Sequence, residues 1–154
     1  MRDEEGVRRL VEHMAMTWAD LGFPKMPARV LMAMMTADSE SLTAAELAER
    51  LEVSPAAISG AVRYLLQIGM LRRHPAPGSR QHAYALPEDA WYEASIMKGT
   101  AYRAIVKVTE EGMPALAPGT PSAERFAEMR DFFVFMQGEM TDLLERWHAS
   151  RGAR

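Results

Sequence analysis

Residues 43–86 read TAAELAERLEVSPAAISGAVRYLLQIGMLRRHPAPGSRQHAYAL. The stretch opens with a capping box, because Thr43 and Glu46 have the spacing at which a hydroxyl and a carboxylate satisfy each other's free backbone donors. Ser54 and Pro55 then have the form of an N-cap followed by a first-turn proline, and Gly69 ends the second helix. The pattern predicts two short helices joined by a turn at 52–53, which is a helix-turn-helix.

A β-hairpin is predicted directly after this helix pair. Two short segments, 70–74 and 80–86, flank the proline- and glycine-rich residues 75–79. Residues 41–42 are a candidate for a further, very short strand. The predicted fold is therefore mainly α with a small β-hairpin wing, a winged helix-turn-helix.

Helices are predicted on both sides of this lobe. Apolar residues at spacings of three and four predict a first helix over about 3–21, and Gly22 and Pro24 end it. A second helix is expected to start near Pro27 and to run to Thr36. Further helices are predicted over about 88–111 and about 122–148, with residues 112–121 as a loop between them.

The charge distribution points to a partner that carries negative charge. The net charge is −3, yet residues 53–87 hold four arginines and no carboxylate. The remaining residues are acidic on balance, so the distribution matters more than the sum. This window coincides with the second helix of the pair and the wing, which is where a winged helix-turn-helix meets DNA.

The candidate DNA contacts lie at the start of the second helix and on the wing. A carboxylate-free N-terminus with small residues can enter the major groove, and its free amides can meet a phosphate. The candidates are Thr43, Ser54, Pro55, Ala56, Ala57, Ser59, Gly60, Arg63, Arg72, Arg73, Ser79 and Arg80.

Several of these residues have two interpretations. Thr43 and Ser54 are helix caps whether or not they also touch a phosphate. Gly60 serves either the close approach of DNA or tight packing on the preceding helix. Arg72 and Arg73 are neighbours in an extended segment and point to opposite faces, so one is expected to contact DNA and the other to pair with a carboxylate.

The outer helices carry apolar seams of the kind that packed helices use. Spacings that alternate between three and four predict a homodimer formed by the first and last helices. The candidate interface residues are Val7, Val11, Met14, Trp18, Phe126, Met129, Phe133, Met136, Met140, Leu143 and Trp147. The expected organisation is a dimerisation helix at 1–22, a DNA-binding lobe at 23–87, and a linker helix with a dimerisation helix at 88–154, in one compact unit.

Residues 47–60 and 65–71 resemble the MarR family of bacterial regulators. The wing residues 77–80, Tyr84 and Trp91 make the resemblance closest to the GbsR-like branch. The resemblance implies a cytoplasmic homodimer, a repressor, that binds inverted-repeat operators in double-stranded DNA and is released by a small molecule. Candidate residues for an effector pocket are Trp18, Met34 and Trp91, with plain packing as the alternative for each.

Other classes of protein find little support in the sequence. It contains no cysteine, and its histidines are scattered at 13, 74, 82 and 148, so no local metal-binding spacing is present. The common nucleophile and phosphate-binding motifs are absent too, so neither an enzyme nor a cofactor is expected. The charged N-terminus does not resemble a signal peptide, and no apolar stretch is long enough to span a membrane. The remaining alternative is a winged helix that binds protein without reading DNA sequence.

Overall fold

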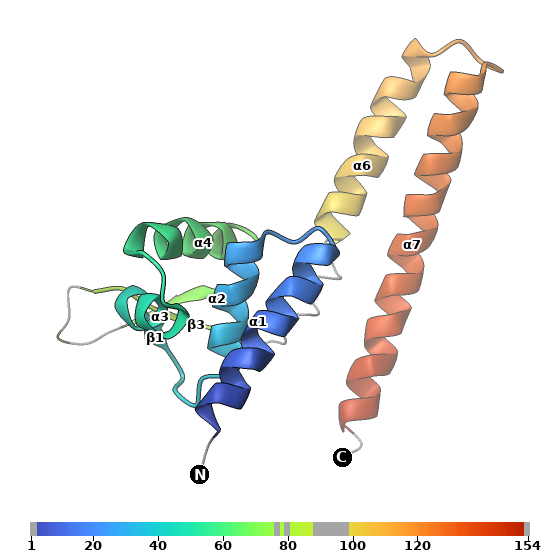
Figure 1. Ribbon diagram of the computed structural model, residues 1–154. Coiled ribbons are helices and arrows are strands. Elements are labelled where there is room, and N and C mark those ends of the chain that lie inside the picture. Colours follow the sequence, from blue (N-terminus) through green and yellow to red (C-terminus); the bar gives the residue numbers. More distant parts are fainter. Residues whose placement is uncertain (1–2, 76–77, 79–80, 88–98, 153–154) are drawn as a thin grey trace. The chain divides into compact units, whose positions relative to one another are not determined.

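The computed structural model describes residues 3–75, 78, 81–87 and 99–152. The first part of the chain forms α1 (Glu4–Asp20), α2 (Lys25–Met35), β1 (Leu42–Thr43), α3 (Ala44–Leu51), α4 (Pro55–Gln67), β2 (Arg72–His74) and β3 (Ala83–Ala85). The second part forms α6 (Gly99–Gly112), the 3-10 helix η1 (Met113–Ala115) and α7 (Pro121–Gly152). This order confirms the mainly helical fold with a small sheet that the sequence predicts (Figure 1).

The helix starts follow the capping residues. Asp3 accepts a hydrogen bond from the Gly6 amide at 2.9 Å and caps α1. Thr43 and Glu46 form the predicted capping box at the start of α3. The Ser54 hydroxyl accepts from the Ala57 amide at 3.3 Å, and Pro55 is the first residue of α4.

Two helix starts differ from the prediction because of prolines. The helix expected to begin near Pro27 begins at Lys25, with Pro24 as its N-cap. Pro27 falls within the first turn, where a backbone N–H has no helical partner to lose. Similarly, Pro121 was placed in the loop but is the first residue of α7, and the Thr120 hydroxyl accepts from the Ala123 amide.

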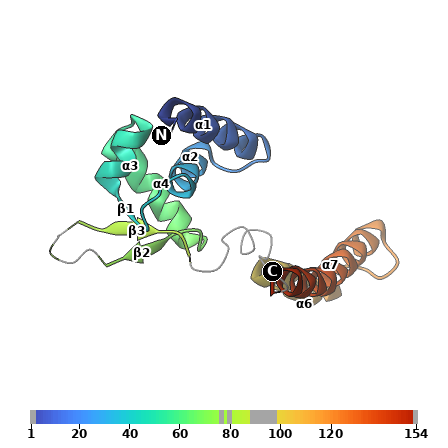
Figure 2. The ribbon, with the colours of Figure 1, turned by 90° about the horizontal axis from the view of Figure 1, so that it is seen from below.

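The wing is a three-stranded antiparallel sheet with the order β1-β3-β2. β3 is the central strand, since it pairs with β1 through Leu42 and Tyr84 and with β2 through Arg73 and Tyr84. The short strand expected at 41–42 therefore exists, displaced by one residue. Figure 2 shows the sheet on the side of the lobe that faces away from α1.

The core of the lobe lies between the helices and the sheet. α1 packs along α2, and α2 also packs on α3 and α4 (Figure 1). The largest fully buried side chains come from four of these elements and are those of Val30, Leu31, Leu42, Leu47, Ile58 and Leu65. This core holds α3 and α4 in place from behind, which leaves the front of α4 to solvent.

The contacts divide the chain into two units, Met1–Ala94 and Ser95–Arg154, and the predicted organisation as one compact unit stays a prediction. The physical reason for the division is that α6 and α7 pack mainly on each other, as an antiparallel pair, with the Tyr102 and Phe133 rings 5.5 Å apart. The first helix packs on α2 within the first unit, and its role in dimerisation stays a prediction. The boundaries at 22 and 87 between functional segments stay a prediction.

Candidate nucleic-acid interface

The outer face of α4 is the centre of the candidate site. Its inner face is buried through Ile58, Ala61, Val62 and Leu65. The predicted contact residues lie on the other side and are exposed, apart from the half-buried Ala57: Ser54, Pro55, Ala56, Ser59, Gly60 and Arg63. The helix therefore presents a surface of small residues without a carboxylate, with one arginine about a turn beyond Ser59.

Gly60 lies within α4 without a structural need for glycine. Its φ is not in the left-handed region, and a Cβ built on it meets nothing within 4 Å. Of the two interpretations from the sequence, tight packing on α3 finds no support in this geometry. A glycine inside a helix costs roughly 1 kcal/mol relative to alanine, and the close approach of DNA to Gly60 stays a prediction.

Arg63 is a free cation on this face. Its side chain is exposed, and within the described part of the chain its guanidinium makes no hydrogen bond or ion pair. A guanidinium in that position can donate two hydrogen bonds to a guanine edge or bind a phosphate. The geometry leaves Arg63 available for a ligand.

The wing arginines have different surroundings. Arg72 is half-buried, and its Nε donates to the Leu86 carbonyl oxygen at 3.2 Å. Arg73 is exposed on the opposite face of the strand. A carboxylate partner for one of the two arginines stays a prediction, beside the backbone carbonyl that Arg72 bonds. Ser79 and Arg80 lie outside the described residues.

Thr43 is first of all a helix cap. Its hydroxyl donates to Glu46 Oε2 at 2.9 Å and accepts from the Glu46 amide at 3.2 Å, and its own amide donates to the same carboxylate at 2.7 Å. The backbone bond, followed by the hydroxyl bond, lowers the pKa of Glu46. A contact between Thr43 and a phosphate stays a prediction.

Two family models match the two halves of this arrangement. Residues 21–82 match the MarR family, and residues 89–150 match a model described as an MmpR5-like MarR family transcriptional regulator. Together they span most of the chain, including the whole helix-turn-helix. The chain belongs to the MarR family of transcriptional regulators.

Two individual relatives cover nearly the whole chain. The HTH-type transcriptional regulator MmpR5 of Mycobacterium tuberculosis is 26% identical over 153 residues, which are 99% of this chain and 93% of that protein. A crystal structure described as a transcriptional regulator is 26% identical, with a TM-score of 0.79 over 94% of this chain and 99% of that one. The α4 face and the wing thus belong to a MarR-type winged-helix DNA-binding lobe.

The predicted interface residues of this MarR-family chain fall into two groups. In α1, Val11 is buried, and Val7 and Trp18 pack partly against the core of their own lobe, so intrachain packing accounts for them. Met14 is exposed. In α7, exposed positions of the predicted seam are Phe126, Met129, Leu143 and Trp147, whereas Phe133 and Met136 are half-buried and Met140 is buried.

An apolar groove runs along the pair of α6 and α7. It has a volume of about 750 Å³ and is lined by residues that include Ile105, Val108, Phe126, Met129 and Phe133. The Val108 side chain is 67% exposed and contributes to a contiguous apolar patch. The groove and the exposed seam residues of α7 together form a large apolar surface on the second unit.

Two of the three residues proposed for an effector pocket, Trp18 and Met34, belong to the core cluster of the lobe or pack against it. Met34 is buried in the core of the lobe. Trp18 packs edge-to-face on Phe23, with ring centroids 5.4 Å apart. Trp91 lies outside the described residues. Packing therefore accounts for Trp18 and Met34, and an effector site involving them stays a prediction.

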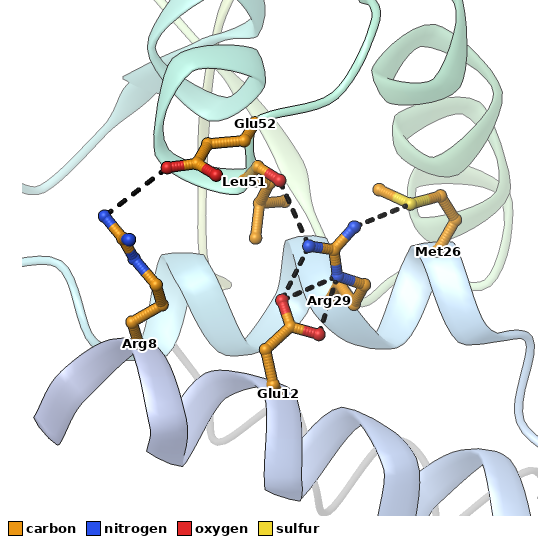
Figure 3. A network of polar contacts seen from close by, with 6 residues as sticks. All are labelled: Arg8, Glu12, Met26, Arg29, Leu51 and Glu52. Carbon is orange, nitrogen blue, oxygen red and sulfur yellow. Dashed lines mark hydrogen bonds and ion pairs between the residues drawn. The ribbon is translucent and has the colours of Figure 1, made fainter. Parts of the chain in front are cut away.

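The sequence analysis did not predict a network of polar contacts that joins α1, α2 and the end of α3, just before α4. Figure 3 shows Arg29 of α2 between Glu12 of α1 and the Leu51 carbonyl at the end of α3, with Arg8 and Glu52 beside them. The network joins residues far apart in sequence, so no periodicity reveals it. The available signal was Arg29 itself, a charge among the apolar residues of α2, because a charge on a buried helix face needs a partner.

None of the helices in the described residues combines the length and the apolar character needed to cross a bilayer.

Proposed function

We propose that this MarR-family protein binds an inverted-repeat operator in double-stranded DNA as a homodimer, with α4 in the major groove and the wing along the backbone. The observation that carries the proposal is the exposed, carboxylate-free face of α4, which ends in the guanidinium of Arg63, a group without a partner among the residues that the structure describes. A protein-binding winged helix has no need to exclude acidic residues there, whereas a DNA-binding face does.

Direct reading of bases is expected to be limited. The exposed residues between Ser54 and Gly60 are Pro, Ala, Ser and Gly, and of their side chains only the Ser54 and Ser59 hydroxyls can form hydrogen bonds. Arg63 can make the bidentate contact with guanine that gives most major-groove specificity. We therefore assign base reading to Arg63 and phosphate contacts to the α4 N-terminus, Arg73 and Arg80.

Homodimerisation is supported by the apolar surface of the second unit. Phe126, Leu143 and Trp147 on α7 are all more than 40% exposed. Apolar surface of this extent on one helix pair favours burial against a second copy over exposure to water. Two-fold symmetry would set the two recognition helices about one DNA turn apart, which is the spacing that an inverted repeat provides.

The remaining parts of the proposal rest on the family resemblance. We propose that the protein acts as a cytoplasmic repressor and that a small molecule releases it from DNA. Its placement in the GbsR-like branch stays a prediction, because the model that matches residues 89–150 is MmpR5-like.

A gel-shift titration against the DNA upstream of the protein's own coding sequence tests the proposal. Arg63→Ala should weaken binding by about 1–3 kcal/mol, the loss expected for a bidentate base contact, and Arg80→Ala should weaken it uniformly across DNA sequences, as the loss of a phosphate contact does. Binding should also fall steeply as salt is added, because each neutralised phosphate releases counterions. Arg9→Ala is the matched control, since Arg9 lies on α1 and pairs with Glu5.

The outcomes separate the two functions under consideration. Absence of binding at low salt, with the protein folded, would favour the protein-binding winged helix. Binding that is unchanged in both arginine variants would show that DNA meets another face of the lobe.

A further inference from the structure

We infer that Arg29 is a positioning residue that couples α1 to the turn of the helix-turn-helix and so sets where the recognition helix begins. The inference rests on the proposed DNA-binding function, and it concerns residues that do not reach DNA themselves. It assigns a role to the polar network of Figure 3, which joins α1, α2 and the end of α3.

The first step is the geometry of the ion pair. Arg29 Nε donates to both Glu12 oxygens, at 2.8 and 3.0 Å, and Nη2 donates to Glu12 Oε1 at 2.6 Å. The Arg29 side chain is 18% exposed and that of Glu12 is 39% exposed. A forked pair of this kind holds both side chains in one orientation, more firmly than an exposed ion pair does.

The second step is a further hydrogen bond, which Arg29 makes to a residue outside the ion pair. Arg29 Nη2 also donates to the Leu51 carbonyl oxygen at 3.0 Å. Leu51 is the last residue of α3, and its carbonyl is one of those that a helix end leaves without a helical partner. The neighbouring carbonyls of Ala48 and Glu49 are met by the amides of Val53 and Glu52. Arg29 thus adds a cap at the C-terminal end of α3.

The third step is the short path from Leu51 to the DNA-reading helix. Glu52 takes a left-handed conformation with φ 54°, which is uncommon for a residue other than glycine. Ser54, the N-cap of α4, follows two residues later. With so short a connection, a displacement of the Leu51 carbonyl is passed to the start of α4.

The fourth step is that polar side chains link α1 to the end of α3 across space that apolar packing does not fill. A cavity of about 170 Å³ lies there, lined by residues that include Val7, Glu49 and Leu51. Arg8 and Glu52 bridge from α1 to the turn at 3.5 Å, but their side chains are 60% and 70% exposed, so this pair contributes little. The stronger link is the one through Arg29.

The test compares conservative variants with matched controls in the full-length protein. Arg29→Lys keeps the charge, but a single ammonium group cannot form the forked hydrogen bonds to Glu12 and also bond the Leu51 carbonyl. Glu12→Gln keeps the length of the side chain and removes the charge that orients Arg29. The controls are Arg9→Lys and Glu5→Gln, the same changes in an exposed pair on α1 whose two residues bond at 3.4 Å.

Each variant is measured for thermal unfolding, for affinity to the operator DNA well below its melting temperature, and for hydrogen exchange. We expect Arg29→Lys and Glu12→Gln to weaken DNA binding by roughly 2- to 30-fold, the range seen for residues that couple sites without touching ligand. The Glu52 and Val53 amides, which bond to Glu49 and Ala48, should exchange faster than in the wild type. Both controls should leave affinity and exchange unchanged.

Two results would overturn the inference. One is an Arg29→Lys protein that binds DNA as the Arg9→Lys control does. The other is a loss of DNA affinity that the smaller fraction of folded protein fully explains, together with unchanged hydrogen exchange of the Glu52 and Val53 amides. The network would then only stabilise the fold. The exchange measurement needs no DNA, so it tests the coupling even if the protein proves not to bind DNA.

Discussion

At the residue scale, the two positions of greatest interest are a glycine and an arginine on α4. Arg63 is exposed and unpaired within the described chain, so its charge is available to a ligand. Gly60 is exposed and has open space where a side chain would be. The open space at Gly60 leaves room for a ligand to approach α4 closely, as the proposed function requires.

Gly60→Ala should therefore change stability and DNA binding in opposite directions. The helix gains about 0.5–1 kcal/mol from alanine, which raises the melting temperature. The new methyl group would stand between α4 and the DNA, so the dissociation constant measured by fluorescence anisotropy should rise.

Gly138→Ala is the matched control for this change. Gly138 lies within α7, and a Cβ there also meets nothing within 4 Å. It should raise stability without altering DNA affinity. If Gly60→Ala binds DNA as tightly as the wild type, DNA does not approach α4 at this position.

At the element scale, the helix-turn-helix depends on its caps. α3 has only eight residues, so its own hydrogen bonds contribute little stability, and the ends decide whether it forms. It is held at the N-terminus by the capping box of Thr43 and Glu46 and at the C-terminus by Arg29. The first of these is visible in sequence because both partners are local.

Thr43→Ala should destabilise the lobe by about 1 kcal/mol, because it removes the N-cap of α3. Denaturant unfolding at neutral pH measures the change. Thr141→Ala is the control, since Thr141 bonds to Gln137 within α7 and caps no helix end.

The capping box should also contribute a pH dependence. Hydrogen bonds from Thr43 lower the pKa of Glu46 below its ordinary value of 4.5 in the folded state. Its stabilising effect is therefore present above the unfolded pKa and is lost as the pH falls through the lower, folded pKa. The stability difference between wild type and Glu46→Gln should shrink over that acidic range, and a constant difference would contradict this account.

At the scale of the whole molecule, the second unit has more apolar surface than its own packing covers. The paired helices α6 and α7 leave a groove of about 750 Å³ and several exposed aromatic side chains. In the proposed homodimer this surface would be the place for the second copy, and the two linked lobes would then bind DNA with an avidity greater than the affinity of either lobe alone.

Replacing both Phe126 and Leu143 by Asp should give a monomer, with a mass near 17.2 kDa by light scattering at micromolar concentration. Burying either charge in an apolar interface is costly. DNA affinity should fall with the loss of the second lobe. Thr141→Asp, which adds a charge at an exposed polar position of α7, should stay dimeric. A wild-type protein that is itself monomeric would disprove the dimer.

The sequence by itself determined the elements whose signals are local. Capping residues, prolines and apolar spacing act within a few residues, so they placed α3, α4 and the wing strands and marked the carboxylate-free face around Arg63. Only the tertiary structure decided what depends on residues brought together from afar. Val11 and Trp18 look like interface residues in sequence but pack on their own lobe, Gly60 proves to face open space, and Arg29 meets Glu12 and Leu51 across three helices. Hydrophobic periodicity indicates which face of a helix is buried. Only the tertiary packing decides which element or subunit covers that face.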